Sequence, residues 1–207
     1  MFRGWTVRRS VVITVASAVL IVAVVAILAF RSTGPDSQLS AKLLSSNQVP
    51  SGWLSESFSA AVKDTGCLAS AMNPEGLHDV AEVNVLYVND GSVPPEVGEE
   101  IATFRNVNGA FKKITSSLQT CTKIHGDNPN ASGVSGSVVP LVLPHFGTGS
   151  EAVVATLTDE SVPVTLTDDL VLIEKGKYVV EVYEANFLGK VNHRQFEEFI
   201  AKALSKV

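Results

Sequence analysis

Few residues in this sequence are spaced as a catalytic site requires. Ser135 follows Gly133 as in a nucleophile elbow, but Ser137 stands where the second glycine belongs, and no strand-to-helix pattern surrounds it. The segment from Gly133 to Ser137 therefore predicts a flexible loop. Four histidines lack the spacing of metal ligands: His78, His125, His145 and His193. We expect no catalytic residues, no metal site and a protein that is not an enzyme.

Two pairs of adjacent carboxylates, Asp168-Asp169 and Glu197-Glu198, are poor candidates for acid/base catalysis. Neighbouring side chains point in different directions on a strand or a helix, so both members of a pair cannot serve one proton transfer. We expect both pairs on a solvated surface. Gly147-Thr148-Gly149 lacks the third glycine of a phosphate-binding loop and predicts a turn, so no cofactor is expected. Asn130-Ala131-Ser132 matches a glycosylation acceptor, a pattern short enough to occur by chance.

The first element that could position a site is a long apolar segment, Val11–Phe30. As a helix, these twenty residues cover the roughly 30 Å hydrocarbon core of a bilayer. Basic residues are more frequent before the segment than after it, which places residues 1–10 in the cytoplasm. A cleaved signal peptide is the alternative, but its apolar core would be shorter, and Ile27 occupies a position that favours a small residue. We predict a signal anchor that crosses the cell membrane once.

The chain after the span is expected to be extracytoplasmic. A short polar linker, residues 31–37, leads into residues 38–207, a length that suits one globular domain. The chain beyond Phe30 holds all 21 acidic residues and 13 of the 16 basic ones, a formal net charge of −8. This balance argues against nucleic acid as a partner and against a surface that holds anionic lipid headgroups.

Two cysteines, Cys67 and Cys121, lie in this exported part, where the compartment is oxidising. Such a pair favours a disulfide over two free thiols. In the loop-entropy model, the bridge would stabilise the fold by about 4 kcal/mol. The alternative is two buried thiols that act as small hydrophobic side chains, which a thiol titration would reveal.

The first part of the domain carries mixed signals. A helix is expected from Asp36 or Ser37 to about Ser46, with Leu39, Leu43 and Leu44 on one side. Residues 53–62 are compatible with a strand, and residues 64–79 show turn residues without a sustained period. Residues 80–88 are rich in valine and predict a strand.

The middle of the domain is expected to be helical and then loop-like. Apolar residues recur at spacings of three, four and seven between Val97 and Cys121, which predicts a helical region with an interruption at 106–109. Residues 123–150 hold five glycines and three prolines and read as a long loop, with an edge strand at 138–143. A long loop on a rigid scaffold is either the lip of a binding site or an ordinary mobile connection, and the apolar side chains of this segment favour the lip.

The last part is specified most clearly. Strands are expected at 151–158 and 162–167, followed by a hairpin at 170–184 around a glycine turn. Asn192 is placed as the N-cap of a closing helix, with Gln195 three residues later. A continuous apolar stripe predicts that this helix packs on the sheet.

The order of several short motifs resembles the PknH-like extracellular sensor domains of actinobacterial receptor kinases and stand-alone anchored proteins. The similarity covers most of 39–207 and is carried by Leu43–Gly52, Ala110–Cys121, Phe146–Ala152, the Val171–Val182 hairpin and the closing helix. It implies an α+β fold, a twisted antiparallel sheet packed against helices, with a cleft for a ligand. This sequence has fewer cysteines than the kinase sensors, and Leu118 stands where tryptophan is expected.

These observations predict a membrane-anchored, ligand-binding or sensor-like domain of the cell envelope, with unknown ligand-binding residues. Ten residues before the span are too few for a kinase, so we expect no signalling through a cytoplasmic catalytic domain. The alternative is a structural or assembly partner of another envelope protein. A pocket of some hundreds of Å³ with a few polar groups would favour a small molecule, and a flat exposed apolar patch would favour a protein.

Overall fold

A computed structural model describes residues 37–56, 66–89, 95–125, 133–159, 162–186 and 190–207. The expected span, Val11–Phe30, and the glycosylation pattern Asn130-Ala131-Ser132 lie outside these residues. In the described part, no helix combines the length and the apolar character that crossing a membrane requires.

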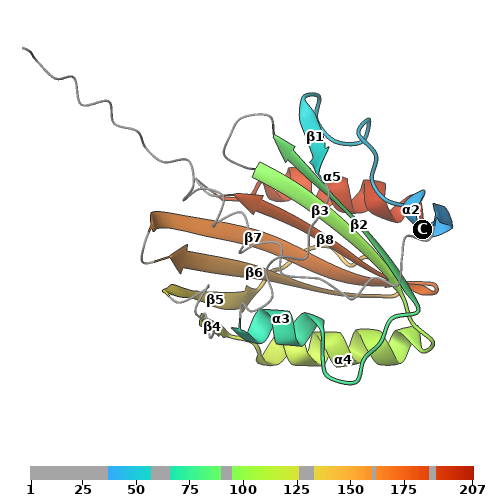
Figure 1. Cartoon of the computed structure of the whole chain (residues 1–207), viewed down its shortest axis with the longest axis horizontal. Helices are drawn as coiled ribbons and strands as arrows, with labels where there is room; N and C mark the ends of the chain where they lie inside the picture. The colour runs from blue at the N-terminus through green and yellow to red at the C-terminus, as the bar shows by residue number, and fades with distance from the viewer. Residues whose placement is uncertain (1–36, 57–65, 90–94, 126–132, 160–161, 187–189) are drawn as a thin grey trace, which may run out of the picture.

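An antiparallel sheet of eight strands forms the centre of the described structure (Figure 1). Across the sheet, the strands follow the order β1-β2-β3-β8-β7-β6-β5-β4. Their bounds are β1 Trp53–Glu56, β2 Ala81–Asn89, β3 Pro95–Thr103, β4 Lys123–His125, β5 Val134–Pro140, β6 Gly149–Asp159, β7 Val162–Lys175 and β8 Tyr178–Asn186. Pairing of β3 with β8 joins the N-terminal and C-terminal parts of the sheet.

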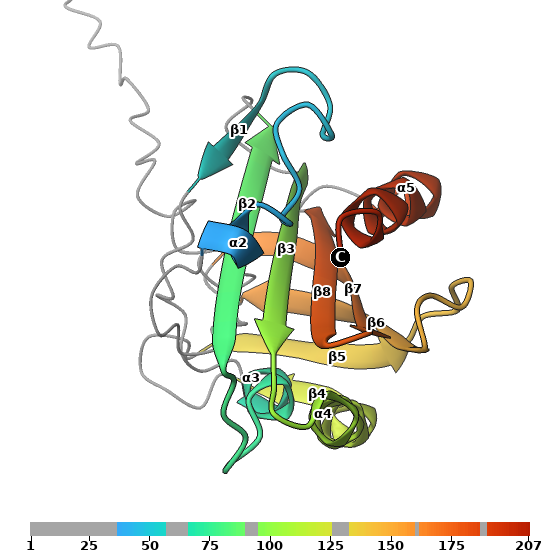
Figure 2. The same cartoon turned by 90° about the vertical axis from the view of Figure 1, so that its right-hand side faces the viewer.

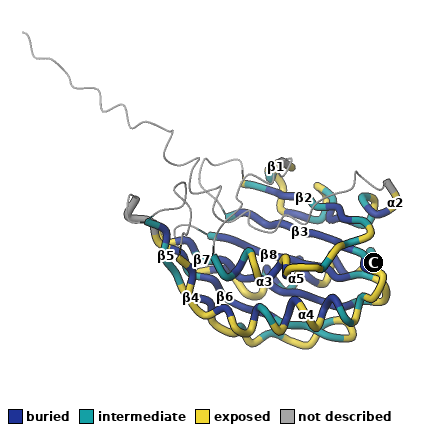
Figure 3. Tube along the Cα trace, turned by 60° about the horizontal axis from the view of Figure 1, so that its bottom comes forward, coloured by how far each residue is buried: buried dark blue, intermediate teal, exposed yellow. Residues whose placement is uncertain are grey.

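Helices cover both faces of the sheet, as Figures 1 and 2 show. Helices α3, Gly66–Met72, and α4, Val107–Thr120, pack on one face, which we call the α4 face. The short α2, Ser37–Ser40, and α5, His193–Leu204, pack on the other, the α5 face. Each face has its own hydrophobic core, and α4 turns an exposed side outward (Figure 3). The predicted α+β fold is confirmed.

The C-terminal elements agree with the sequence-based expectations. Strands β7 and β8 form the predicted hairpin, with Gly176 at φ 61° in its turn. Asn192 caps α5 by accepting a hydrogen bond from the Gln195 backbone N–H at 3.4 Å. The predicted turn at Gly147 also forms, and the Thr148 N–H donates to the Glu174 carbonyl at 2.9 Å.

The predicted helix over the first part of 97–121 is wrong, because residues 95–103 form strand β3. Val97 and Ile101 are four residues apart, a spacing that places two side chains on one side of a helix and also on one face of a strand. Their neighbours Glu96, Glu99 and Glu100 resemble the polar side of a helix, yet all three are buried. The helix begins at Val107, after Asn106 as N-cap.

Other local expectations also fail. The predicted helix to Ser46 is limited to α2, although Leu39, Leu43 and Leu44 are buried as expected. Helix α3 occupies part of 64–79, and Ser135 lies in strand β5 rather than in a flexible loop. Strand β5 also replaces much of the expected loop, because pairing with β6 compensates for the low strand propensity of its glycine and serines.

The predicted disulfide is confirmed. Cys67 in α3 and Cys121 at the end of α4 are joined, with an S–S distance of 2.02 Å. The bridge fixes the two helices of the α4 face to each other. The alternative of two free thiols is therefore wrong.

Candidate functional site

Nine carboxylates are buried in the described part of the chain, eight of them on the three central strands β3, β7 and β8 and one on β2. They are Glu82, Glu96, Glu99, Glu100, Asp168, Asp169, Glu174, Glu181 and Glu184. Charged side chains are rarely buried without a partner, because desolvation strongly disfavours the ionised form. This concentration of acids is therefore the chemically most unusual feature of the domain.

Six of these carboxylates lie on the α4 face. Glu174 accepts a hydrogen bond from Asn108 of α4 at 3.3 Å. The other five, together with Tyr183, we call the acidic cluster: Glu82, Glu96, Glu100, Asp168 and Glu181. Strand register pairs Glu100 with Glu181 across β3 and β8, and Glu82 lies diagonal to Glu100 on β2. Opposed residues on one face of an antiparallel sheet have Cβ atoms about 5 Å apart. Glu96 on β3 and Asp168 on β7 both pair with Ala185, which lies between them on β8.

Tyr183 lies between these two sets of acids. It pairs with Gly98 on β3, and a Cβ at position 98 would overlap the Tyr183 ring, so glycine is required there by close approach. The Tyr183 side chain is buried, at 5% exposure, and its hydroxyl has no hydrogen-bond partner. Burial raises the pKa of Tyr183 well above its usual value, and the surrounding carboxylates raise it further.

Desolvation raises the pKa values of four carboxylates in the acidic cluster. Burial, with a smaller contribution from Asp79, raises the pKa of Glu82 to about 8. Burial also raises the pKa values of Glu100, Asp168 and Glu181 well above their usual range, and neighbouring carboxylates add to each shift. Both side-chain oxygens of Glu82 and of Glu181 lack hydrogen-bond partners. The cluster therefore holds protons and unused hydrogen-bonding capacity inside the fold.

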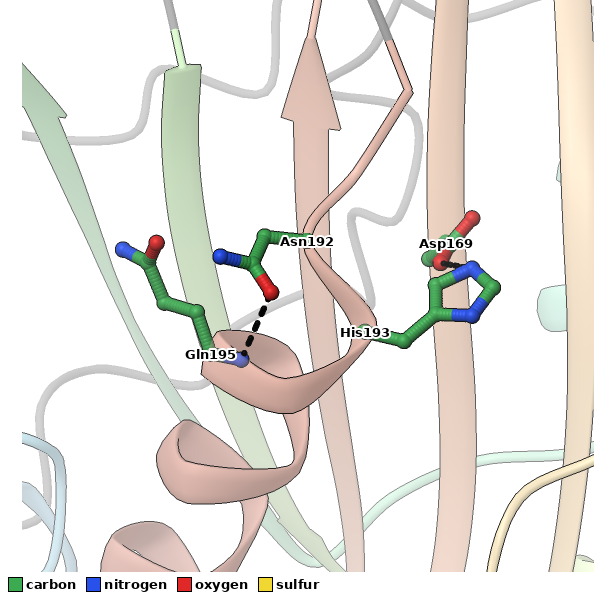
Figure 4. A network of polar contacts seen from close by, with 4 residues as sticks. All are labelled: Asp169, Asn192, His193 and Gln195. Atoms are coloured by element: carbon green, nitrogen blue, oxygen red, sulfur yellow. Dashed lines mark hydrogen bonds and ion pairs between the residues drawn. The ribbon is translucent and has the colours of Figure 1, made fainter.

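The carboxylates of the α5 face are better satisfied. His193, at the start of α5, places Nε2 at 3.0 Å from Asp169 Oδ2 on β7 (Figure 4). Burial raises the pKa of Asp169, and the charge of His193 opposes this shift. Glu99 accepts a hydrogen bond from the Leu44 backbone N–H. These contacts attach the helices to the sheet, so we assign them a structural role.

A hollow of about 770 Å³ lies where the α3–β2 connection meets the start of α4. Its apolar lining includes Leu77, Val80, Phe104 and Ala110, and its polar lining includes His78, Asp79, Arg105 and Asn106. Asp79 joins the two features, because it lines the hollow and its charge raises the pKa values of Glu82 and Glu100. This arrangement can hold a small molecule against an apolar wall while its polar groups face His78, Asp79 and Arg105.

A second hollow, of about 440 Å³, lies beside the N-terminal half of α5. Residues from the α5 helix and from 49–50 line it, and Arg194, Glu198 and Lys202 supply its charged groups. Arg194 and Glu198 form an exposed ion pair at 3.6 Å within the helix. Because these groups are largely solvated, this hollow is a weaker candidate for selective binding.

The structure revises several predicted positions. Asp168 and Asp169 do point to opposite faces, but both are buried, so the expectation of a solvated surface is wrong for this pair. Glu198 is exposed as expected. The segment 123–150 lines neither hollow in its described part, and Leu141, Leu143 and Phe146 pack on the α5-face core. Across the described ranges, no three His, Cys, Asp or Glu side chains are grouped to hold a metal ion.

Sequence reasoning missed the acidic cluster because its members come from four strands. A signal was present in 95–103, where three glutamates alternate irregularly with apolar residues. Those glutamates resemble a solvated helix surface until pairing with β8 places them inside the sheet.

Comparison with known proteins identifies the fold. No family model matches the sequence, and no curated protein matches it either. The crystal structure of the extracellular domain of PknH from Mycobacterium tuberculosis is similar, with a TM-score of 0.57 at 13% identity, over 83% of this chain and 98% of that chain.

Two further solved structures show weaker similarity. An uncharacterised protein from Mycobacterium smegmatis, the Rv0999 ortholog, has a TM-score of 0.42 at 15% identity, covering 77% of this chain and 78% of that one. LpqN of Mycobacterium tuberculosis, described as involved in cell envelope biogenesis, has a TM-score of 0.28 at 12% identity, covering 64% and 76%. The similarity to the first structure extends over nearly all of that domain, and the chain has the PknH-like sensor-domain fold.

Proposed function

We propose that this protein is an extracytoplasmic, non-enzymatic domain of the cell envelope that binds a small molecule in the hollow beside α4. The segment Val11–Phe30 would anchor it as a single span, with residues 1–10 in the cytoplasm. The fold shared with a kinase extracellular domain supports the location. The confirmed disulfide supports it as well, because structural disulfides persist in oxidising compartments.

The observation that carries the proposal is the composition of the hollow. Its volume of about 770 Å³ falls within the range of small-molecule sites. Phe104 and Leu77 give it apolar walls, while His78, Asp79 and Arg105 supply a few groups that can fix the orientation of a ligand. Phe104 and Arg105 connect β3 to α4, so two regular elements fix their positions, whereas Leu77, His78 and Asp79 come from the α3–β2 connection.

The alternative, a docking surface for another envelope protein, receives less support. Large exposed apolar side chains in the described part are Leu54, Val80, Val139 and Val142. They lie on β1, before β2, and at or just after the end of β5, so they come from separate places in the fold. A protein interface of ordinary size requires a contiguous patch.

A pair of valine substitutions tests the proposal. Val80 lines the hollow and is 54% exposed, whereas Val139 is 49% exposed on β5 and lines neither hollow. The Val80→Trp change should fill the hollow with little effect on folding, and Val139→Trp is the matched control. Full-length protein would be purified in detergent, and native mass spectrometry would detect co-purifying small molecules.

We expect a bound molecule on the wild-type protein and on the Val139→Trp control, and at least a tenfold lower occupancy on Val80→Trp. Equal occupancy in both variants would show that the hollow is not the site.

A further inference from the structure

We propose that the hollow beside α4 binds an α-amino acid with a large apolar side chain, which places its ammonium group at Asp79 and its carboxylate at Arg105. Both residues line the hollow. This inference rests on the proposed function, and it names the chemical class of the ligand for the same hollow.

The ends of β2 and β3 bring these two charges to one place. Ala81 and Thr103 form the pair at this end of the two strands, next to α3 and α4 (Figure 2). The two chain segments stay together at the next residue, because the Val80 backbone N–H donates to the Thr103 carbonyl at 2.6 Å. Asp79 and Arg105 each lie two residues beyond the pair, on the two facing segments. An acid and a base therefore reach the hollow from neighbouring segments.

These opposite charges are not paired with each other. Neither of the ion pairs found in the described residues includes Asp79 or Arg105. The Oδ2 atom of Asp79 is shielded from solvent and has no hydrogen-bond partner, although the residue lines an open hollow. An unsatisfied carboxylate oxygen away from water is costly, so a ligand that donates to this carboxylate would relieve that cost.

The rest of the hollow suits an apolar group. Its apolar side chains are Leu77, Val80, Phe104 and Ala110. Gly76 and Gly109 also line it, and they carry no side chain that would fill it. The volume of about 770 Å³ has room for an aromatic or branched side chain against these walls.

A ligand that carries both charges suits both charged groups. A simple anion would be repelled by Asp79, and a simple cation would be repelled by Arg105. A neutral apolar molecule would leave the buried Asp79 oxygen without a donor. In a zwitterion, the ammonium group donates to the carboxylate of Asp79, and the guanidinium of Arg105 binds the ligand carboxylate through two parallel hydrogen bonds.

The short distance between the two segments favours an α-amino acid over a longer zwitterion. Opposed residues of paired strands have Cβ atoms about 5 Å apart, and the hydrogen bond at Val80 holds the segments together at this point. The two protein charges therefore require a ligand whose own charges are close. An α-amino acid carries both on one carbon atom, and its side chain is free to reach the apolar walls.

The test uses full-length protein in detergent, dialysed to remove bound molecules, and isothermal titration with L-phenylalanine. The comparator 2-phenylethylamine lacks the carboxylate, and 3-phenylpropanoate lacks the ammonium group. Glycine is the comparator that has both charges and no apolar side chain.

Two variants each remove one charge from the hollow, Asp79→Asn and Arg105→Gln. Glu75→Gln, exposed in the α3–β2 connection, and Lys112→Gln, exposed on α4, are the matched controls, and neither residue lines the two hollows described above. Val80→Trp should block the apolar part of the site, with Val139→Trp as its control.

We expect L-phenylalanine to bind the wild-type protein at least tenfold more tightly than each of the three comparators. Asp79→Asn should remove the preference over 3-phenylpropanoate, and Arg105→Gln should remove the preference over 2-phenylethylamine. Such selective losses distinguish lost charge recognition from a general structural defect, which would weaken every ligand alike. All variants should retain a cooperative thermal transition, and the three controls should bind as the wild type does.

Any of four results would overturn the inference: no binding of L-phenylalanine, equal affinity for either singly charged analogue, unchanged preferences in the two charge variants, or undiminished binding to Val80→Trp. The outcome is separable from that of the proposed function. A co-purified molecule that Val80→Trp loses, together with no binding of L-phenylalanine, would leave the proposed function standing and remove the amino acid. Equal occupancy of the co-purified molecule in both valine variants, together with no binding of L-phenylalanine, would remove both.

Discussion

At the scale of single residues, Glu181 shows how a carboxyl group is buried within the sheet. Its neighbours across the strands are Glu100 and Leu172, so it faces a like charge on one side and an apolar side chain on the other. Neither neighbour stabilises an ionised carboxylate. Burial and these neighbours therefore favour the neutral acid and raise the pKa of Glu181 well above its usual range.

This environment predicts that Glu181→Gln increases the unfolding free energy at pH 8. At that pH the wild-type carboxyl must either ionise in the core or keep a proton that it would lose in water. The amide has nearly the same shape and does not ionise, so the variant avoids the cost of holding a proton above the unfolded-state pKa. We expect a gain in unfolding free energy of about 1.4 kcal/mol for each pH unit over which only the folded state keeps that proton. At pH 5 the difference should shrink, because the glutamic acid is then neutral as well. Urea unfolding at both pH values measures the change, and Glu198→Gln is the exposed control. A loss of stability at pH 8 would contradict the assignment of an unpaired acid.

The contact between Gly98 and Tyr183 is a feature that could not be predicted from the sequence. A glycine in the middle of a strand predicts weakness or close approach, but it does not indicate which side chain approaches. The partner comes from register, and register between β3 and β8 depends on segments far apart in the chain. The acidic cluster could be identified only after that pairing was known.

At the scale of elements, the disulfide joins α3 to α4 and closes a loop of 54 residues that contains β2 and β3. In the loop-entropy model, a bridge that closes such a loop restricts the unfolded chain and raises the unfolding free energy by about 4 kcal/mol. We therefore expect Cys67→Ser to lower the unfolding free energy by about that amount, measured by urea denaturation under oxidising conditions.

A double-mutant cycle supplies the control for this prediction. Adding Cys121→Ser to Cys67→Ser should cost little more, because the first change already removes the bridge. Additive losses would mean that the two positions contribute through packing alone.

The elements differ in how well the sequence predicted them, and the reason is the range of the interactions that specify them. Helix α5 was predicted because its cap and apolar stripe are local, and the β7–β8 hairpin because its turn is local. Strand β3 was mistaken for a helix because it gains its strand conformation from two neighbours, β2 and β8. Helix α3 was missed because it is short and depends on contact with α4.

At the scale of the whole molecule, the buried acids make stability depend on pH. Burial raises the pKa of Glu82 to about 8, that of Glu184 to about 8 and that of Glu99 to about 7. In the unfolded chain these groups titrate near 4.3. Between these values the folded state binds more protons than the unfolded state, so the unfolding free energy decreases as the pH rises.

We therefore expect the melting temperature of the free protein to be highest near pH 5 and to fall by several degrees by pH 8. Differential scanning calorimetry at constant ionic strength measures this, and the Glu181→Gln variant should show a shallower dependence. A melting temperature that rises from pH 5 to pH 8 would contradict the raised pKa values.

The disulfide and the closing helix were thus accessible from composition and local pattern, and the fold class from the family resemblance, whereas the site was not. Its hollow combines Asp79 before β2 with Phe104 and Arg105 before α4, and the acids behind it come from both halves of the sheet. No single stretch of the sequence contains enough of these residues to indicate a binding site.

The pairing of β3 with β8 also has a consequence for how the chain acquires its structure. The disulfide loop carries Glu82, Glu96 and Glu100, while Asp168, Tyr183 and Glu181 arrive on the later β7–β8 hairpin. Until that hairpin docks, the earlier glutamates remain hydrated and ionised at neutral pH. Docking must therefore take protons from the solvent, and long-range strand pairing of this kind is intrinsically slow. The newly synthesised chain should consequently fold faster in a mildly acidic medium than in a neutral one, which makes the acidity of its surroundings a determinant of when the domain matures.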